Sequence, residues 1–227
     1  GRSATGRGDG TVSRGTVEPA APGVVGTGVR FGADGLIDCG PLPGIEALWR
    51  SAAVPVPEAQ ATRPGAIWQS FTLETWIRYE EHPERGARAT RGILSPPHFP
   101  LFRHEAWRWQ GQFAPPGAAS LHVFSRDPYP EGEWRHLALR YDAPRGELAL
   151  FVDGALAAGG AGLAVVSAVA AELAPFSRPM TIGDDRIGTL DEARFSVVAR
   201  SDDWLRLSYL NQKSPQLRIR VGKQEER

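Results

Sequence analysis

The fold is decided by the stretch Phe71-Thr72-Leu73-Glu74-Thr75-Trp76-Ile77-Arg78-Tyr79, in which apolar and polar residues alternate. Successive side chains of a β-strand point to opposite faces, so this alternation is typical of a half-buried strand. One face is apolar and carries Phe71, Leu73, Ile77 and Tyr79. The other face carries Thr72, Glu74 and Arg78 together with Trp76. We therefore predict a strand over residues 71–79 whose apolar face lies against a core.

Shorter strand-like segments lie on both sides of this stretch. Residues 29–31 and 36–39 flank a glycine-rich turn, and residues 41–70 hold too many prolines for a regular sheet. Residues 101–112 predict one continuous strand, and residues 120–124 predict another. Turn residues separate these segments at short intervals, which is typical of an all-β domain.

The second half of the chain follows the same pattern and ends with a helix. Residues 134–141 and 147–152 predict a hairpin around a turn that contains Pro144 and Gly146. Further strands are expected at residues 181–183, 189–197 and 217–221. Ser201 can cap a helix that has Asp202 and Asp203 in its first turn. Many short strands with one late helix predict a β-sandwich or a β-barrel.

Composition excludes several classes of partner. The 227 residues suit one large β domain, and 26 basic residues balance 26 acidic ones. Nucleic acids and anionic membrane surfaces normally need a basic face, so neither is expected as the main partner. Cys39 is the one cysteine, which excludes an internal disulfide and a cysteine zinc site. The apolar residues 155–176 are broken by glycines and Glu172, so we expect no membrane insertion.

We expect three parts along the chain. Residues 1–15 have almost no apolar side chains and predict a flexible leader. Residues 16–222 form the folded domain, and residues 223–227 form a charged tail.

Five motifs occur in a fixed order along the chain. They are Gly28-Val29-Arg30-Phe31, Phe71-Thr72-Leu73-Glu74-Thr75-Trp76-Ile77, Gly132-Glu133-Trp134-Arg135-His136-Leu137-Ala138, Leu150-Phe151-Val152-Asp153-Gly154 and Gly188-Thr189-Leu190-Asp191-Glu192-Ala193-Arg194-Phe195. Together with a helix at residues 199–212, they resemble the laminin G-like domain of the concanavalin A-like lectin/glucanase superfamily, in its bacterial envelope type. The resemblance covers roughly residues 23–212. It implies a two-sheet antiparallel jelly-roll β-sandwich with one short C-terminal helix.

Glucanases of this superfamily carry two glutamates and an aspartate on alternate residues of one strand. Retaining hydrolysis needs two carboxylates about 5–5.5 Å apart, which such spacing supplies. This chain has no such array, since Glu80-Glu81, Asp184-Asp185 and Asp191-Glu192 are adjacent pairs whose members face opposite sides of a strand. We therefore expect that the protein is not an enzyme.

A glycan platform is one candidate site. Trp107 and Trp109 share a face if residues 101–112 form one strand, and Arg103 and Glu105 extend that face with polar groups. Aromatic faces pack on sugar rings while polar groups bind hydroxyls. Tyr129, between two prolines, is a further loop candidate. The alternative is that both tryptophans belong to the core, where this residue type is usually found.

The resemblance also implies a calcium site, because many related sandwiches bind calcium near one rim. It points to Asp34, in the first turn, and to Asp191, in the closing motif. Calcium needs six to eight oxygen ligands. The alternative is that Asp34 serves its turn and Asp191 binds nearby backbone groups.

These observations predict a non-catalytic recognition or adhesion module that binds a glycan or an extracellular or envelope protein. We expect it in a larger bacterial protein that is extracellular or in the cell envelope. One alternative is a structural spacer domain without its own ligand, and a less favoured one is a glycan-cleaving enzyme.

Overall fold

The computed structural model of the chain describes residues 10–40, 70–80, 91–95, 101–105, 108–113, 121–128, 130–160, 180–183 and 187–214. Within them the strands pair antiparallel throughout, and one helix follows the last strand. The protein is an all-β jelly-roll sandwich, as the sequence predicts.

The largest sheet has seven strands. In spatial order these are β13 (Ala155–Gly160), β12 (Glu147–Val152), β11 (Trp134–Asp142), β5 (Phe71–Arg78), β15 (Gly188–Ser196), β3 (Thr27–Phe31) and β2 (Val17–Pro22). The central strand β5 is the predicted stretch, and the predicted hairpin is formed by β11 and β12.

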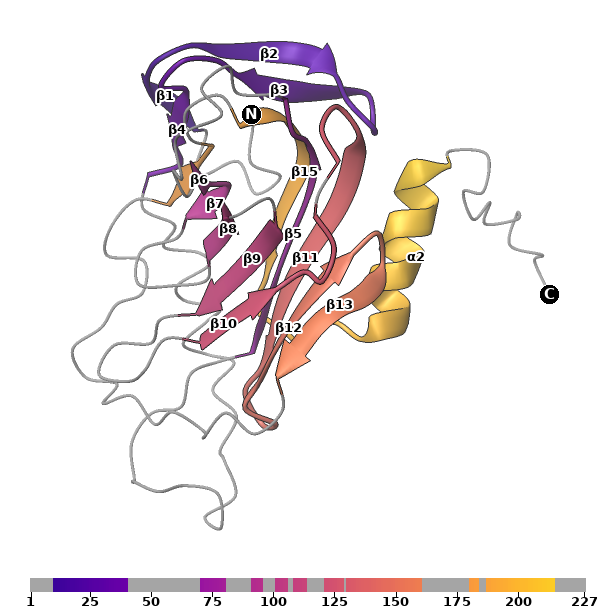
Figure 1. Cartoon of the computed structure of the whole chain (residues 1–227). Coiled ribbons are helices and arrows are strands. Elements are labelled where there is room, and N and C mark those ends of the chain that lie inside the picture. Colours follow the sequence, from indigo (N-terminus) through magenta and orange to yellow (C-terminus); the bar gives the residue numbers. More distant parts are fainter. Residues whose placement is uncertain are drawn as a thin grey trace, which may run out of the picture.

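Two four-stranded sheets complete the sandwich. One contains β10 (Leu121–Phe124), β9 (Arg108–Phe113), β8 (Leu101–Glu105) and β6 (Arg91–Gly92), in this order. The other contains β1 (Thr11–Arg14), β4 (Leu36–Asp38), β14 (Thr181–Ile182) and β7 (Leu94–Ser95). Figure 1 shows the β6–β10 sheet on one side of the large sheet and helix α2 (Asp202–Lys213) on the other side.

Three aromatic rings join the two layers at the centre of the core. Phe71 of β5 stacks on Tyr141 of β11 at 5.6 Å between ring centroids, and Phe113 of β9 lies 4.5 Å from Tyr141. Burial raises the pKa of the Tyr141 phenol to about 12. Gly111 of β9 lies so close to β11 that a Cβ there would stand 2.2 Å from Leu139 Cδ1. The sheets therefore pack at close range through β9.

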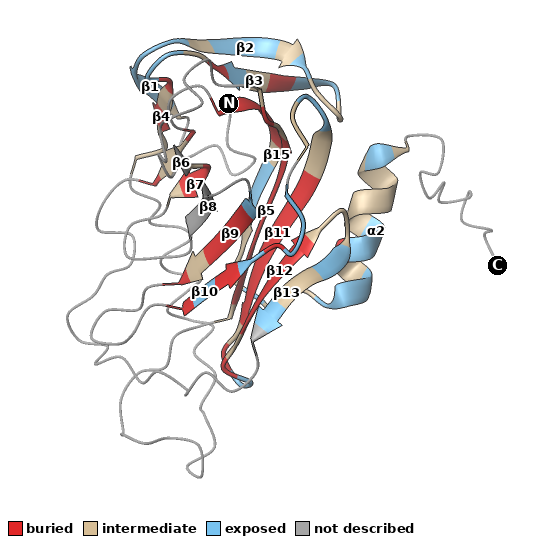
Figure 2. Ribbon diagram, viewed as in Figure 1, coloured by how far each residue is buried: buried red, intermediate tan, exposed pale blue. Residues whose placement is uncertain are grey.

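Strand β5 is buried on both faces. Phe71, Leu73 and Ile77 contact the core between the sheets, as the alternation predicts. On the opposite face Thr72, Glu74 and Trp76 are also buried (Figure 2), with Glu74 only 2% exposed. The polar face of β5 is thus covered rather than solvated, which the sequence did not indicate.

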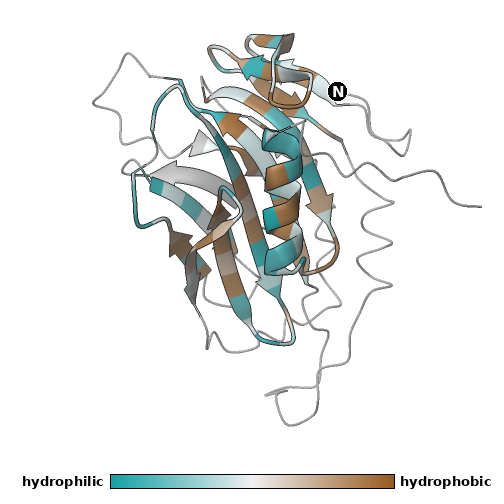
Figure 3. Cartoon of the chain, turned by 90° about the vertical axis from the view of Figure 1, so that its right-hand side faces the viewer, coloured by the Kyte–Doolittle hydropathy of each residue, from teal (hydrophilic) through white to brown (hydrophobic). Residues whose placement is uncertain are grey.

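Helix α2 covers that second face (Figure 3). Ser201 caps it as predicted, because its hydroxyl accepts a hydrogen bond from the Trp204 N–H at 3.2 Å. Leu205 is fully buried, and the Tyr209 ring stacks on Trp76 at 5.6 Å between centroids. The Trp76 indole N–H donates to the side-chain oxygen of Gln212. The helix is therefore attached to β5 by packing and, near its C-terminal end, by a hydrogen bond.

Two expectations from the sequence require correction. Residues 101–112 form two antiparallel strands, β8 and β9, and not one continuous strand. Thr11–Arg14 forms strand β1 on β4, so folded structure begins inside the segment that we expected to be a leader. The predicted strand at residues 217–221 and the tail at residues 223–227 lie outside the described residues. None of the described helical segments has the length and hydropathy needed to span a membrane.

Truncation of Trp76 tests the double burial of β5. We expect Trp76→Ala to lower the free energy of unfolding by about 3–5 kcal/mol, the range for large buried aromatics. Trp134 is only partly buried, so Trp134→Ala is a matched control with a smaller loss. Both values come from chemical denaturation followed by circular dichroism, and a Trp76→Ala protein as stable as wild type would contradict the burial.

Candidate functional site

A pocket of about 460 Å³ opens at one edge of the sandwich. Among the described strands, β10 ends one sheet and β13 ends the other at this edge. Figure 1 shows β10 beside the β12–β13 hairpin. Trp109 of β9 lines the pocket between two walls, one from the loop after β10 and one from the β12–β13 hairpin. We call this the edge pocket.

The first wall is formed by Ser125, Arg126, Asp127, Pro128 and Pro130. Ser125 fixes this loop to β9. Its N–H donates to the Trp109 carbonyl at 2.8 Å, and its hydroxyl accepts from the Trp109 N–H at 3.1 Å. The same hydroxyl donates to the Asp127 carbonyl at 2.9 Å. The two prolines restrict the backbone further, so the wall is preorganised.

Arg126 and Asp127 are the exposed charges of this wall. Within the described residues, neither side chain takes part in an ion pair or a side-chain hydrogen bond. A guanidinium with five N–H donors stands beside a carboxylate that accepts hydrogen bonds. Neither charge has a partner among the described residues that a ligand would have to displace.

The second wall is apolar with one anchored charge. Val152, Leu156 and Ala157 line it, and Leu156 is 56% exposed. Arg135 donates to Asp153 Oδ2 at 2.6 Å and to Glu133 Oε2 at 2.7 Å. The hydrogen bond with Asp153 raises the pKa of Arg135, and desolvation opposes that rise. Arg135 is therefore held in place and its charge is compensated.

The predicted aromatic platform is wrong for Trp109. Its side chain is 2% exposed and belongs to the core, as the alternative interpretation has it. The register pairs His104 with Trp109 and Glu105 with Arg108. Because the chain reverses between β8 and β9, positions 103 and 105 lie on the sheet face opposite to Trp109. Trp107, Tyr129 and the side chains of Arg103 and Glu105 lie outside the described residues.

Sequence reasoning missed most of the edge pocket. Tyr129 was predicted as a loop candidate, and the two prolines that flank it line the pocket. Arg126, Arg135 and Leu156 were not identified, because they come from three separate stretches with no common spacing. The paired prolines at positions 128 and 130 were the one local signal of a fixed loop.

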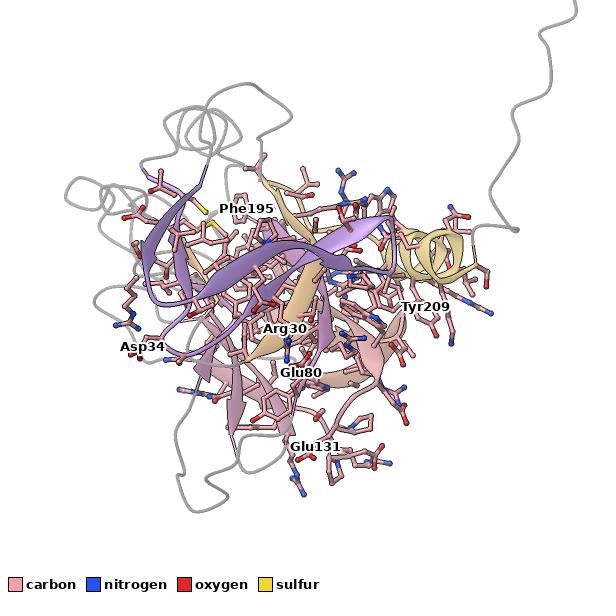
Figure 4. All side chains as sticks on the ribbon, turned by 90° about the horizontal axis from the view of Figure 1, so that it is seen from above. Arg30, Asp34, Glu80, Glu131, Phe195 and Tyr209 are labelled. Carbon is pink, nitrogen blue, oxygen red and sulfur yellow. The ribbon has the colours of Figure 1, made fainter. Side chains whose placement is uncertain are left out.

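The two predicted calcium ligands are not brought together. Asp191 is buried, and its Oδ2 accepts N–H bonds from Val24 and Val25, both at 2.8 Å. Its Oδ1 accepts from the Glu192 N–H at 2.8 Å. Asp34 is exposed in the turn after β3 (Figure 4), whereas Val24 and Val25 precede β3. Backbone donors occupy the Asp191 oxygens, and among the described residues no three acidic, histidine or cysteine side chains are arranged so that they could hold a metal ion.

The charges near the end of β5 are paired with one another. The Arg30 guanidinium donates to Glu80 Oε2 at 2.7 Å, and Figure 4 shows the two residues side by side. Arg78 lies 3.6 Å from the other Glu80 oxygen. These side chains are already paired, in contrast to Arg126 and Asp127.

Residues 52–206 match a laminin G family model described as the concanavalin A-like lectin/glucanases superfamily. The chain belongs to this family. Among curated proteins, none is significantly similar to this laminin G-like chain in sequence.

Several solved structures share its fold. The binding domain of Paraclostridial Mosquitocidal Protein 1 superimposes with a TM-score of 0.63 at 10% identity, over 89% of this chain and 47% of that one. The binding domain of Botulinum Neurotoxin DC in complex with SialylT gives 0.61 at 9% identity, over 90% and 47%. A third structure concerns botulinum neurotoxin type C, whose cell entry is said to depend on interaction with two ganglioside molecules. It superimposes with a TM-score of 0.63 at 10% identity, over 91% of this chain and 47% of that one. The laminin G-like chain thus spans about half the length of these neighbours, and the likeness concerns the fold.

Replacement of Asp191 tests its role in holding the backbone. We expect Asp191→Asn to lower the free energy of unfolding by about 1–3 kcal/mol, because the NH₂ group that replaces one of the two oxygens cannot accept a backbone N–H bond. Thermal unfolding is measured for both proteins in calcium and in EDTA. A backbone role predicts the same loss in both buffers. A calcium-induced rise in wild-type stability that Asp191→Asn abolishes would contradict it.

Proposed function

We propose that this laminin G-like chain is a non-catalytic recognition module that binds a glycan or a protein in its edge pocket. The observation that carries the proposal is that Arg126 and Asp127, on a fixed loop opposite an apolar wall, have no charged partner among the described residues. Ligand sites combine apolar lining with placed polar groups, and this pocket contains both, with polar surface slightly in excess. Its volume of about 460 Å³ suits one or two sugar rings or a few side chains.

The neighbours support a binding role in a general way. Two of them are described as binding domains, one in complex with SialylT. Because this chain spans about half of their length, their ligands do not transfer to its pocket. The wider context is part of our proposal, namely a larger bacterial protein that is secreted or in the cell envelope.

The pocket chemistry favours binding over glycan cleavage. Hydrolysis of a glycosidic bond uses two carboxyl groups that flank the bond. Asp127 is the one carboxylate among the described residues that line the pocket. Glu74, with His136 Nε2 at 3.6 Å, is almost fully buried beneath α2 and is closed to a substrate. The spacer alternative differs from our proposal by predicting no ligand.

A glycan array tests the proposal directly, in calcium and again in EDTA. We compare wild type with Arg126→Ala/Asp127→Ala, which removes both free charges of the loop. Hydrogen bonds to charged groups contribute about 1.5–3 kcal/mol each, so we expect binding to weaken by about 10-fold or more.

The matched control is Asp203→Ala/Arg206→Ala, which removes an exposed pair on α2 and also leaves the net charge unchanged. It should bind as wild type does. Binding that survives EDTA excludes a calcium requirement. Binding that both double variants retain equally would place the ligand elsewhere, and no ligand on the glycan array or among peptides would favour the spacer.

A further inference from the structure

The two edges of the seven-stranded sheet differ in how they are protected. An edge strand presents unpaired N–H and C=O groups, which natural proteins shield with prolines, charges or bulges. Edge strand β2 holds Pro19 and Pro22, and Glu18 adds a charge. Ala20 has a positive φ of 63°, at the place where the register with β3 shifts. The β2 edge is thus shielded in several ways.

Edge strand β13 has few of these features. Its sequence is Ala-Leu-Ala-Ala-Gly-Gly, without proline or charge. Ala155, Leu156 and Gly159 are exposed, and a Cβ at Gly159 would meet no atom closer than 3.7 Å. One irregularity in its register with β12 leaves Ala157 unpaired against the edge pocket. Among the described strands, β13 pairs with β12 alone.

We propose that the ligand of the edge pocket is an extended polypeptide segment that adds as a strand to β13. This inference rests on the proposed function and specifies its ligand. In strand addition the main-chain hydrogen bonds supply affinity, and pockets for alternate side chains supply specificity. The structure offers both at one place, since Leu156 and Ala157 belong to the open strand and also line the pocket.

The pocket also indicates what the added segment carries. A segment paired with β13 directs every second side chain toward the gap between the layers. Val152 and Ala157 favour a small apolar side chain there. Arg126 and Asp127, across the gap, favour polar or oppositely charged neighbours on the segment.

A partner peptide fits this edge better than a second copy of the chain. The β13 strand of another copy carries only methyl groups, one leucine and glycines. This strand would therefore bring no charged group to Arg126 or Asp127. Unmatched charges in a buried contact are unfavourable, so complementarity selects a segment with charges of its own.

A proline scan of the edge tests the inference. Adjacent residues of a strand direct their N–H groups to opposite sides, so Ala158→Pro and Gly159→Pro have different effects. One proline removes an N–H that bonds β12 and lowers the melting temperature. The other removes only an outward N–H and leaves the melting temperature unchanged, and this second protein is the edge-blocked variant.

The probe is a phage-displayed library of random linear peptides selected on the whole chain. We expect enriched peptides with alternating apolar side chains, whose synthetic forms bind the edge-blocked variant about 10-fold more weakly through the lost main-chain bonding. Asp203→Ala/Arg206→Ala should bind them as wild type does. Bound peptide should slow amide hydrogen exchange at residues 155–160, a measurement that needs no variant.

The outcomes separate this inference from the proposed function. The inference is overturned if no peptide is enriched, or if enriched peptides neither slow exchange at residues 155–160 nor respond to the edge-blocking proline. It is also overturned if sedimentation shows a dimer that this proline dissociates, since a second copy then covers the edge. If a glycan binds through Arg126 and Asp127 and the proline does not affect its binding, the inference of a peptide ligand is overturned. The proposed function then stands. If neither a glycan nor a peptide binds, both the inference and the proposed function are overturned.

Discussion

Strand β5 is covered twice, by the β6–β10 sheet on one face and by α2 on the other. On the inner face the rings of Phe71, Phe113 and Tyr141 join the layers. Both faces of β5 are buried, so each face has a cover of its own. The late helix supplies the second of these covers, over Thr72, Glu74 and Trp76.

Polar groups on the helix side explain how this cover is held. The Thr72 hydroxyl donates to the Val198 carbonyl at 2.8 Å and accepts from the Arg200 N–H at 3.0 Å, which fixes the segment that leads into α2. Arg140 donates to the Arg200 carbonyl at 3.1 Å and pairs with Asp202 at the start of the helix. These bonds satisfy buried groups that would otherwise be costly. They also place α2 in one position, which packing on small apolar residues such as Ala138 and Ala149 would define less strictly.

The sequence predicted the elements whose signals are local. The faces of β5, the β11–β12 hairpin and the Ser201 cap each follow from neighbouring residues. The break between β8 and β9 was missed because Ala106-Trp107 contains none of the residues that usually mark a turn. Apolar and polar residues alternate only from Trp107 to Gln110, and that short run does not mark where β8 ends. The role of Asp191 could not be derived either, since Val24 and Val25, which donate to its Oδ2, lie more than 160 positions away along the chain.

The edge pocket lay beyond sequence reasoning for a different physical reason. It forms where two layers end, and the positions of those ends depend on the pairing of the whole sandwich. Its loop is held by Ser125 to β9, and its other wall is a ladder of β12 and β13. Exposed residues such as Arg126, Asp127 and Leu156 contribute little to the core. Substitutions at such surface positions usually change stability little. The rim can therefore change its ligand while β5 and its two covers keep the fold, so the family's shared motifs specify the sandwich and not what it binds.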